Sequence, residues 1–528
     1  MTLIPTCKLS LEVTRVLTDI ELAGLKVNRD TLQKIKDDYT KEYNQLENDL
    51  LLIGKEVMGD TPFNLNSADD RSVIVYSRKV KDKKMWKGFF NLGSEIRGNT
   101  RKAKRRVTLS DNQFKRSVKS MTQVQAITIA HRCNECKGTG RVARKRKDGT
   151  YGTARYICKN CDGKGIYYEA TRKVAGLKVG PRSVYDVSVN GFRTDSETLK
   201  ELTLTCSDKA KEFIKKYVKY SAIKTYLKTF IEGIEKALNK NNFIHPQFMQ
   251  CITATGRLSS RSPNFQNMPR GGTFPVRKAI VSRFKNGFIL EGDYSQLEFR
   301  VAGFLSKDKQ VYNDVDNDVD VHSYTAEVMG ISRQDAKAHT FKPLYGGTQG
   351  TEKQREYYGK FKTKYSGVAE WHKQLQEEAI TYKRIKLPSG RVYKFPYVER
   401  TRYGTASHAT AIKNYPVQGF ATADLLPIAL VRTHKAMKTL GLKSMIINTV
   451  HDSIIIDVHP DEKNACILAL QQGMYSISQE CKKRYHIEYD MPIGTELKIG
   501  TDWLNLKEIV WQYHVDNLYF KLSLILFI

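Results

Sequence analysis

Apolar residues recur at helical spacing along much of the N-terminal part of the chain. Residues 11–58 carry this pattern among many charged residues, and the segment from Pro62 to Ser67 then breaks it. Residues 207–238 repeat the spacing with many lysines, which predicts a long basic amphipathic helix. From about Phe243 onward, short β-rich runs alternate with helical stretches, so the pattern predicts α+β or α/β architecture there.

Two apolar runs in the β-rich part end in an aspartate. Residues 288–290 predict a buried strand, with Asp293 at its end before a polar, helical turn. In MIINTVHDSIIIDV, apolar residues flank His451 and Asp452, which predicts a β-hairpin with Asp452 at the bend. A single aspartate in such a place is more often a turn or cap residue. Two that meet at one sheet edge can instead hold two Mg²⁺ ions, about 3.5–4 Å apart, for in-line phosphoryl displacement.

A third segment carries chemistry at regular intervals. Four residues recur every fourth position: Arg333, Lys337, Phe341 and Tyr345. On a helix, each step turns about 40° past a full circle and rises about 6 Å, so the four form a stripe roughly 18 Å long. Two cations followed by two aromatic rings match a triphosphate and then a sugar and base. An ordinary amphipathic helix has the same spacing and remains the alternative.

Charge sets this chain apart from an average globular protein. Its 528 residues, enough for about three or four domains, include 87 Lys and Arg against 56 Asp and Glu, a net charge of +31. Such an excess favours a polyanionic partner, with nucleic acid as the default and a membrane surface as the lesser possibility.

No apolar run approaches the roughly 20 residues of a spanning helix, and no signal peptide is recognisable. The odd number of cysteines, nine, argues against a disulfide scaffold, so we expect a reducing cytoplasm rather than secretion.

The most basic stretch is residues 77–120, with 15 Lys and Arg against three acidic residues. It is too polar to form a core by itself, so we expect a solvated arm or a DNA-facing surface.

A cysteine module follows at residues 131–168. Two Cys-x2-Cys pairs, Cys133 with Cys136 and Cys158 with Cys161, are separated by 21 residues, slightly more than the usual zinc spacing of about 15–20. Together they predict one tetrahedral, structural Zn²⁺ site with no open coordination position. Four unrelated reduced cysteines are the alternative. The segment between the pairs suggests a phosphate-binding finger because of its many cations: Arg141, Arg144, Lys145, Arg146, Lys147 and Arg155.

The two cysteine knuckles, CNECKGTG and CKNCDGKG, resemble the zinc domain of DnaJ-type chaperones. The tripeptide His459-Pro460-Asp461 also matches that of a J-domain, so a non-catalytic chaperone or zinc-binding module is an alternative of a different class. The match is poor, because such chaperones use four knuckles and a helical hairpin around the tripeptide. We expect residues 459–461 to form a turn that leaves a strand.

The aspartate and stripe segments resemble motifs of one enzyme family. EGDYSQLEFR resembles motif A, RQDAKAHTFKPLYGG motif B and VHDS motif C of family A DNA polymerases, the polymerase I type. Residues 253–269 and 414–426 match two further motifs, and the resemblance runs from about Lys8 to Glu508, except for the basic and zinc segments. The chain is identified as a phage-like member with a DnaJ-like zinc-knuckle insertion in the thumb.

The resemblance implies an α+β, multidomain right-hand fold with an antiparallel-sheet palm, helical fingers and thumb, and a small zinc-binding insertion. The implied parts are an N-terminal part of the thumb or polymerase domain (1–76), a basic segment (77–182) with the zinc-knuckle insertion (131–168), thumb helices (183–242), palm with motif A (243–310), fingers with motif B (311–420), palm with motif C (421–508) and an extra C-terminal tail (509–528).

The implied activity is DNA-directed DNA synthesis, in which deoxynucleotides are added to a primer 3′-hydroxyl by two-metal phosphoryl transfer. The catalytic residues would be Asp293, Asp452 and Lys337, with Asp293, Asp452 and the Tyr294 carbonyl binding two Mg²⁺ ions. Residues implied to bind the incoming nucleotide are Arg333, Lys337, Phe341, Tyr345, Glu298 (the gate against a ribose 2′-hydroxyl), His322 and Gln296. Residues implied to contact primer and template are Arg257, Asn267, Gln418 and His451.

Three departures from the family pattern matter. Ser453 replaces the usual third acid of motif C, and Pro343 lies inside the motif B helix, where it should kink the last turn. The zinc module interrupts the expected thumb, and we expect it to extend the grip on duplex DNA.

We expect no exonuclease domain. Asp19 and Glu21 form a D-x-E sequence, but their segment resembles the first polymerase helix. The expected partners are primer-template DNA, deoxynucleotides and a replisome or processivity protein, with no membrane, and the expected state is a monomer. A single-subunit RNA polymerase, which shares the two aspartates, is the alternative within polymerases.

Overall fold

The computed structural model describes residues 4–97, 100–147, 149–348, 350 and 352–509. The expected C-terminal tail therefore lies outside the described residues, apart from its first position. Among the helices that are described, none has the length and apolar character needed to cross a bilayer.

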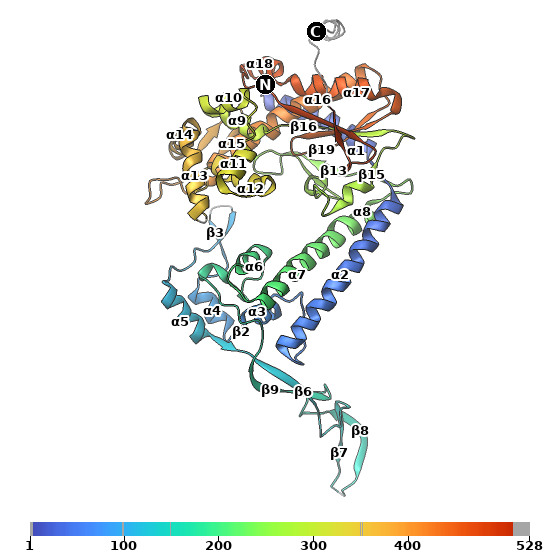
Figure 1. Ribbon diagram of the computed structural model, residues 1–528, viewed down its shortest axis with the longest axis vertical. Helices are drawn as coiled ribbons and strands as arrows, with labels where there is room; N and C mark the ends of the chain where they lie inside the picture. The colour runs from blue at the N-terminus through green and yellow to red at the C-terminus, as the bar shows by residue number, and fades with distance from the viewer. Residues whose placement is uncertain (1–3, 98–99, 148, 349, 351, 510–528) are drawn as a thin grey trace. The chain divides into compact units, whose positions relative to one another are not determined.

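The chain divides into two compact units (Figure 1). The larger unit comprises residues 1–36 and 228–528, and the smaller comprises residues 37–227. Both divisions fall inside helical segments, the helix α2 (Arg29–Met58) and the π-helix η2 (Tyr226–Ile231).

The larger unit combines one main sheet with many helices. These helices are α1 (Pro5–Ala23), α8 (Glu232–Ala237), η3 (Phe265–Asn267), η4 (Pro275–Ala279), α9 (Leu297–Ser306), α10 (Lys309–Asp316), α11 (Val321–Met329), α12 (Arg333–Leu344), α13 (Glu352–Lys364), α14 (Ser366–Tyr382), α15 (Ala409–Gly419), η5 (Phe420–Leu425), α16 (Leu426–Thr439), η6 (Pro460–Glu462), α17 (Lys463–Tyr475) and α18 (Ile477–Tyr485).

The main sheet is antiparallel, in the order β19-β20-β16-β21-β22. Its strands are β16 (Phe288–Tyr294), β19 (Met445–Val450), β20 (Ser453–Val458), β21 (Thr495–Gly500) and β22 (Lys507–Glu508). Smaller pairings use β1 (Leu25–Val27), β12 (Phe243–Ile244), β13 (Gln247–Met249), β14 (Ser259–Arg261), β15 (Ile280–Val281), β17 (Arg384–Lys386) and β18 (Val392–Lys394).

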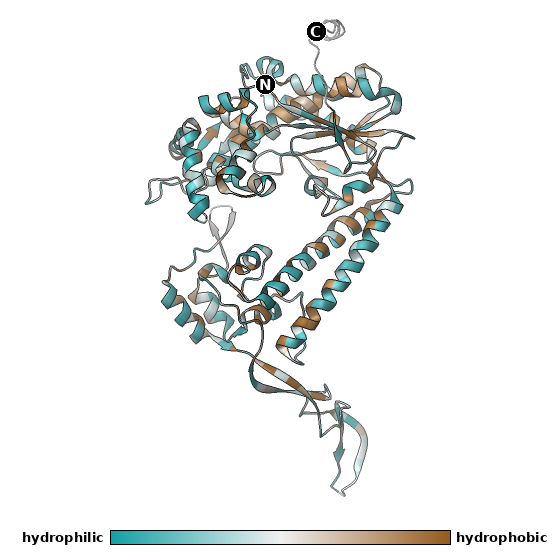
Figure 2. Ribbon diagram, viewed as in Figure 1, coloured by the Kyte–Doolittle hydropathy of each residue, from teal (hydrophilic) through white to brown (hydrophobic). Residues whose placement is uncertain are grey.

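Alternation along β16 decides which side chains face the helices. Leu290 is fully buried, and a Cβ at Gly292 would meet Leu470 and Met474 of α17, so these positions face that helix. Glu291 and Asp293 point to the other side, because successive residues of a strand alternate between faces. Figure 2 shows hydrophobic residues along these strands and their covering helices. One face of the sheet thus belongs to the core, and the other is free to carry polar groups.

The smaller unit has its own core. Its elements are α3 (Ala68–Tyr76), β2 (Arg78–Val80), α4 (Lys83–Phe89), β3 (Ser94–Arg97), β4 (Thr100–Ala103), α5 (Asp111–Met121), β5 (Thr122–Val124), β6 (Ala126–Arg132), β7 (Arg141–Lys145), β8 (Tyr151–Ile157), β9 (Ile166–Val174), η1 (Val184–Asp186), β10 (Val187–Ser188), β11 (Gly191–Phe192), α6 (Ser196–Leu202) and α7 (Asp208–Thr225).

Of the two expectations for residues 77–120, the solvated arm is wrong, and the DNA-facing surface stays a prediction. Trp86, Phe90, Phe114 and Val118 of this stretch are buried in the core of the smaller unit, together with residues of α3, α6 and α7. The few apolar residues lie on one side of short helices, and α5 presents Phe114, Val118 and Met121 at helical spacing. The stretch cannot form a core alone, but it completes a core that other segments supply.

The long helices follow the predicted pattern with two refinements. The helical spacing of residues 11–58 is divided between α1 and α2, with the short strand β1 between them. The predicted helix at 207–238 is present as α7, η2 and α8, and Ser207 caps its start by accepting from the N–H of Ala210. In the smaller unit, Tyr43 of α2 stacks on Tyr220 of α7, with ring centroids 4.7 Å apart.

The cysteine module forms a separate arm of the smaller unit. Strands β6 and β9 pair as its stalk, and β7 and β8 form a hairpin between the two cysteine pairs. Tyr151 and Ile157 of this hairpin are each 67% exposed, so the hairpin contributes no hydrophobic core of its own.

Candidate active site

Asp293 and Asp452 lie together at one end of the main sheet. Asp293 is the penultimate residue of β16, and Asp452 follows His451 in the turn between β19 and β20. The N–H of Tyr294 donates to the carbonyl of Asp452 (3.4 Å), which holds this turn against β16. His451 adopts a left-handed φ of 56°, as a tight reversal requires. The predicted strand and the predicted hairpin with Asp452 at its bend are confirmed.

The two carboxylates strongly perturb each other. Burial and the charge of Asp452 raise the pKa of Asp293 to about 8, and burial also raises the pKa of Asp452. Oδ1 of Asp293 is buried without a hydrogen-bond partner, and Oδ2 lies 3.6 Å from Nη1 of Arg270. Mg²⁺ prefers oxygen ligands and would satisfy both carboxylates. The residues present therefore fit a divalent metal ion.

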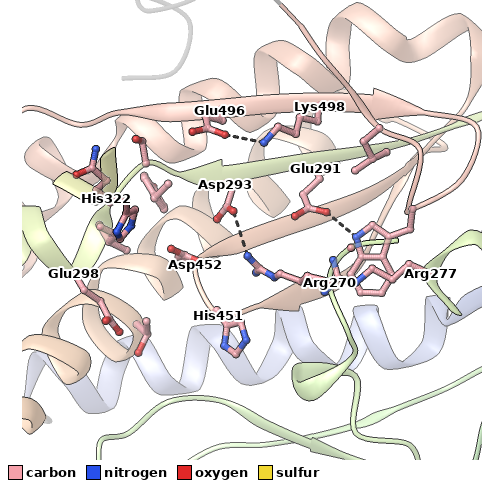
Figure 3. A pocket seen from close by; sticks show the side chains of 18 of the residues that line it. Arg270, Arg277, Glu291, Asp293, Glu298, His322, His451, Asp452, Glu496 and Lys498 are labelled. Atoms are coloured by element: carbon pink, nitrogen blue, oxygen red, sulfur yellow. Dashed lines mark hydrogen bonds and ion pairs between the residues drawn. The ribbon is translucent and has the colours of Figure 1, made fainter. Parts of the chain in front are cut away.

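The aspartates open into a cavity of about 630 Å³ (Figure 3). Figure 3 shows Arg270 directed at Asp293, with Asp452 and His451 on the adjoining turn. The cavity is also lined by Tyr294, predicted to bind metal, and by five of the seven residues predicted to bind a nucleotide: Gln296, Glu298, His322, Arg333 and Phe341.

Glu298 is held by two neighbours. Its two carboxylate oxygens accept hydrogen bonds from the guanidinium of Arg257 and from the hydroxyl of Tyr345. Burial and the charge of Glu298 raise the pKa of Tyr345, which keeps that hydroxyl protonated as a donor. Three residues from separate motifs thus form one fixed cluster at the cavity.

Three of the four stripe residues, Arg333, Lys337 and Phe341, belong to α12 as predicted, and Tyr345 directly follows the helix as its C-cap. Arg333 begins this helix and pairs with Asp320 at 2.5 Å. Burial of Asp320 would raise its pKa, but hydrogen bonds from Arg333 and Ser323 lower it to about 2. The ring of Phe341 stacks on that of Tyr345, with centroids 6.0 Å apart, and lies 5.5 Å from the ring of His322.

Two other predictions for α12 can be placed only in part. Lys337 belongs to the helix, but its side chain lies outside the described part of the structure. The helix ends at Leu344, one residue after Pro343, and the N–H of Gly346 donates to the Pro343 carbonyl at 2.8 Å. Pro343 is thus in the last turn, and the kink itself stays a prediction.

The start of α9 places one further predicted residue. Gln296 precedes this helix in a left-handed conformation, with φ of 53°. Its Nε2 donates to the carbonyl of Val319 at 3.5 Å, and its Oε1 is buried without a hydrogen-bond partner. The side chain is therefore oriented at the wall of the cavity, with one acceptor still available.

Three of the four predicted DNA-contacting residues, Arg257, Asn267 and His451, line a second cavity. This cavity, about 210 Å³, shares Arg257, Thr422 and His451 with the first and is also lined by Asn267. The fourth, Gln418 of α15, hydrogen-bonds to Tyr345. Burial and nearby arginines, with Arg270 the largest charge, lower the pKa of His451 to about 4, so its ring is neutral at pH 7.

Two residues that sequence reasoning missed line the first cavity. Arg270 directly follows the matched segment 253–269, and its position beside a motif was the available signal. Glu496 lies on β21 opposite Asp293, and only the strand register brings the two together. No sequence signal marked Glu496.

The structure explains two short sequence signals, the D-x-E sequence at Asp19 and Glu21 and the tripeptide 459–461. Asp19 of α1 pairs with His434 (2.8 Å) and Lys438 (3.2 Å), and a carboxylate oxygen of Glu21 accepts from the N–H of Phe248 (2.5 Å). Both acids of the D-x-E sequence are thus engaged by other residues of the larger unit. The tripeptide 459–461 leads out of β20 into η6, and the predicted turn is confirmed.

The four predicted zinc ligands gather in the arm of the smaller unit. The Sγ atoms of Cys133, Cys136, Cys158 and Cys161 all lie within 4.8 Å of one another, and the four residues are buried. Cys133 lies 3.7 Å from Cys158, and Cys136 lies 3.7 Å from Cys161. The prediction that the two pairs meet is confirmed.

Glycines make this close approach possible. The N–H groups of Gly140 and Gly165 donate to the Sγ atoms of Cys136 and Cys161, at 3.3 and 3.2 Å. Both glycines have φ near +75°, and a Cβ at either would come within 2.3 Å of a backbone oxygen of the opposite knuckle. Only glycine fits these positions.

The sequence of this chain is similar to those of known DNA polymerases. A family model described as DNA polymerase family A matches residues 176–505. DNA polymerase I of Lactococcus lactis subsp. lactis (strain IL1403) is 29% identical over 341 residues, which cover 60% of this chain and 37% of that protein. DNA polymerase I of Bacillus subtilis (strain 168) is 28% identical over 341 residues, with the same two coverages. The chain thus spans well under half the length of these relatives.

A solved structure has a similar fold. It is the POL domain of Pol1 from M. smegmatis in complex with DNA primer-template and dNTP, with a TM-score of 0.63 and 19% sequence identity. The similarity covers 94% of this chain and 70% of that one. At this identity the likeness shows the α+β right-hand fold that the motifs predicted.

Proposed function

The chain belongs to DNA polymerase family A, and from this premise we propose that it is a DNA-directed DNA polymerase. It adds deoxynucleotides to the 3′-hydroxyl of a primer, in the order that a DNA template dictates. The observation that carries the proposal is the meeting of Asp293 and Asp452 in the cavity that α12 lines with Arg333 and Phe341. The main sheet then belongs to the palm, α12 to the fingers, and α7 to the thumb.

Asp293, Asp452 and the carbonyl of Tyr294 are the groups that we propose to hold two Mg²⁺ ions. When bound, these ions activate the primer hydroxyl and neutralise the charge that develops on the phosphates. The unpaired Oδ1 of Asp293 supports this assignment, as do the pKa values of both carboxyl groups, which burial raises despite the nearby charge of Arg270.

The residues of α12 would bind the incoming nucleotide. Arg333 and Lys337 contact the triphosphate, and Asp320 holds the Arg333 guanidinium in place. Phe341 and Tyr345 flank the new base pair, with His322 and Gln296 lining the nucleotide pocket. Glu298 excludes a ribose 2′-hydroxyl, and because Arg257 and Tyr345 fix its carboxylate, it cannot easily move aside.

Primer and template would lie along the second cavity. Asn267, His451 and Arg257 line it and present neutral or cationic groups, and Gln418 hydrogen-bonds to Tyr345. His451 is neutral at pH 7, so we expect it to contact the primer terminus by hydrogen bonding rather than by charge.

Primer extension tests the proposal. The full chain, given a primer-template and Mg²⁺, should extend the primer with deoxynucleotides and much less with ribonucleotides. Asp293→Ala or Asp452→Ala should abolish addition while primer-template binding persists, because each change disassembles the metal site. Asp461→Ala, at an exposed aspartate of η6, serves as the matched control. Near wild-type extension by either active-site variant would refute the assignment, and extension with ribonucleotides alone would indicate an RNA polymerase.

We also propose that the cysteine cluster holds one structural Zn²⁺ ion. Four ligands about 2.3 Å from a tetrahedral zinc ion lie about 3.8 Å apart, close to the 3.7 Å of the two cross-knuckle pairs. Four thiolates leave no open coordination position, so this ion would organise the arm rather than catalyse. The exposed cations of the β7–β8 hairpin would then contact DNA phosphates.

A further inference from the structure

Asp293 has two cross-strand neighbours, and they differ in charge. It pairs with Ser453 of β20 on one side and with Glu496 of β21 on the other. Ser453 is fully buried, and its hydroxyl donates to the carbonyl of Val450 at 2.9 Å. Directly opposed residues of antiparallel strands share a face of the sheet, so the Glu496 carboxylate lies on the same side as that of Asp293. Of the two neighbours, only Glu496 can add negative charge to the site.

Two cations of the protein contact this group of carboxylates. Nη1 of Arg270 lies 3.6 Å from Asp293, and Nζ of Lys498 lies 2.7 Å from Oε2 of Glu496 (Figure 3). Glu496 is 45% exposed, and both it and Lys498 line the cavity that holds the aspartates. The Glu496 carboxylate is therefore accessible to an ion from solvent, and a lysine side chain is its present counter-ion.

Another carboxylate in the cavity, that of Glu291, is engaged differently. Glu291 lies two residues before Asp293 on the same face of β16, and its Oε2 accepts from Nε1 of Trp503 at 2.7 Å. It is only 9% exposed. Glu291 therefore has the same charge as Glu496 and lies on the same face of the sheet, but its Oε2 is already used in a buried hydrogen bond.

We infer that Glu496 supplies a third carboxylate to the divalent-metal site of Asp293 and Asp452, and that Lys498 neutralises it until a cation binds. The inference rests on the proposed function, since it extends the same metal site. The ligand class is a hard divalent cation, Mg²⁺ or Mn²⁺, which takes carboxylate oxygens. The second observation is that Oδ1 of Asp293 is buried without a hydrogen-bond partner, although Arg270 lies near Oδ2, so an oxygen of Asp293 remains available to a metal ion.

Mn²⁺ binding to the full chain, without DNA or nucleotide, tests the inference. The fraction of free Mn²⁺ is followed by electron paramagnetic resonance. Glu496→Gln should weaken binding by about tenfold, the scale for removing a supporting carboxylate from a metal site. Glu291→Gln, the matched control, should weaken it much less. Glu496→Asp should restore part of the loss, because it keeps the charge.

The counter-ion role of Lys498 predicts a change of opposite sign. Lys498→Met should tighten Mn²⁺ binding in the wild-type background, since it removes the competing cation. In the Glu496→Gln background the same change should have little effect. Lys498 would influence the ion by neutralising the Glu496 carboxylate, and that carboxylate is then absent. A merely structural ion pair would instead lower the thermal stability of both single variants and leave Mn²⁺ affinity unchanged.

The outcomes separate this inference from the proposed function. If Asp293→Ala removes Mn²⁺ binding but Glu496→Gln binds like wild type, the inference fails and the two-aspartate site stands. Equal weakening by Glu496→Gln and Glu291→Gln would also overturn it, because that result reflects general charge. Undiminished Mn²⁺ binding by Asp293→Ala would overturn both.

Discussion

The ring of Phe341 lies between two aromatic neighbours at the edge of the cavity. It stacks on Tyr345 and approaches His322, so its orientation is set by packing on two sides. Phe341 stands one helical turn after Lys337, between the residues proposed for the triphosphate and for the base. In the proposed complex, a ring at this place would face the sugar of the incoming nucleotide without a hydroxyl to offer.

We therefore predict that the enzyme rejects dideoxynucleotides and that Phe341→Tyr relaxes the rejection. In the family that the motifs indicate, phenylalanine here accompanies discrimination, and tyrosine accompanies acceptance. A hydroxyl that gains a partner in the dry, closed site contributes roughly 1–3 kcal/mol, or about five- to 150-fold in selectivity. Chain termination is measured at matched dNTP to ddNTP ratios, with the KM for dNTP as the control. Equal termination by both proteins would show that this ring does not face the sugar.

At the scale of elements, α14 supports the end of α12 through a buried histidine. His372 is 5% exposed, and its ring hydrogen-bonds to the backbone of Leu344, the last residue of α12. The last carbonyls of a helix lack intrahelical donors, so this contact satisfies one of them. Burial and the nearby charge of Lys413 lower the pKa of His372 to about 3.

This histidine makes the protein sensitive to mild acid. Below about pH 6.5 the unfolded state protonates His372, whereas the folded state does not until about pH 3, so stability falls as pH falls through this window. Between pH 6.5 and 5 the loss is about 2 kcal/mol. His372→Gln should remove that part of the pH dependence, as urea unfolding at several pH values would show. Measurement at pH 8 isolates the packing cost of the substitution. Parallel pH profiles of variant and wild type would contradict the prediction.

The arm of the smaller unit depends on its cysteine cluster, because its hairpin contributes no hydrophobic core of its own. Replacing Cys133 and Cys136 by Ser should lose about one zinc ion per chain and weaken DNA binding or processivity more than single-nucleotide addition. Elemental analysis and single-turnover kinetics measure the two effects. Replacing Cys466 and Cys481, buried cysteines of the larger unit, by Ala is the control for zinc content. A native protein without zinc would refute the site.

At the scale of the whole molecule, the charge of +31 predicts DNA binding that weakens steeply with salt. The β7–β8 hairpin should carry part of this dependence, because its cations are exposed. Replacing Arg141, Lys145 and Arg155 by Gln should reduce the slope of log K against log salt by up to about 3, since each lost phosphate contact removes about 0.9. Binding to a primer-template is titrated between low and moderate salt.

The control for this slope removes the same charge elsewhere. Replacing Lys360, Lys373 and Lys482, which pair with acidic residues, by Gln should leave the slope nearly unchanged. An equal loss of slope in both triple variants would mean that net charge, rather than the hairpin, determines the salt dependence.

The sequence by itself determined the features that local spacing encodes. The aspartate at the end of a buried strand, the hairpin around Asp452, the stripe on α12 and the paired cysteines each depend on residues close together in the chain. Periodicity and turn chemistry act over a few residues, so these elements are predictable without a partner segment.

The tertiary structure determined which distant segments contact each other. Glu496 meets Asp293 only because β21 pairs with β16 in one register, and a shift of one residue would turn it to the other face. The basic stretch 77–120 gains a core because α6 and α7 bring apolar residues against Trp86 and Phe114. Burial, strand register and the pKa shifts that follow arise from contacts between segments far apart in sequence, and no local pattern specifies such contacts.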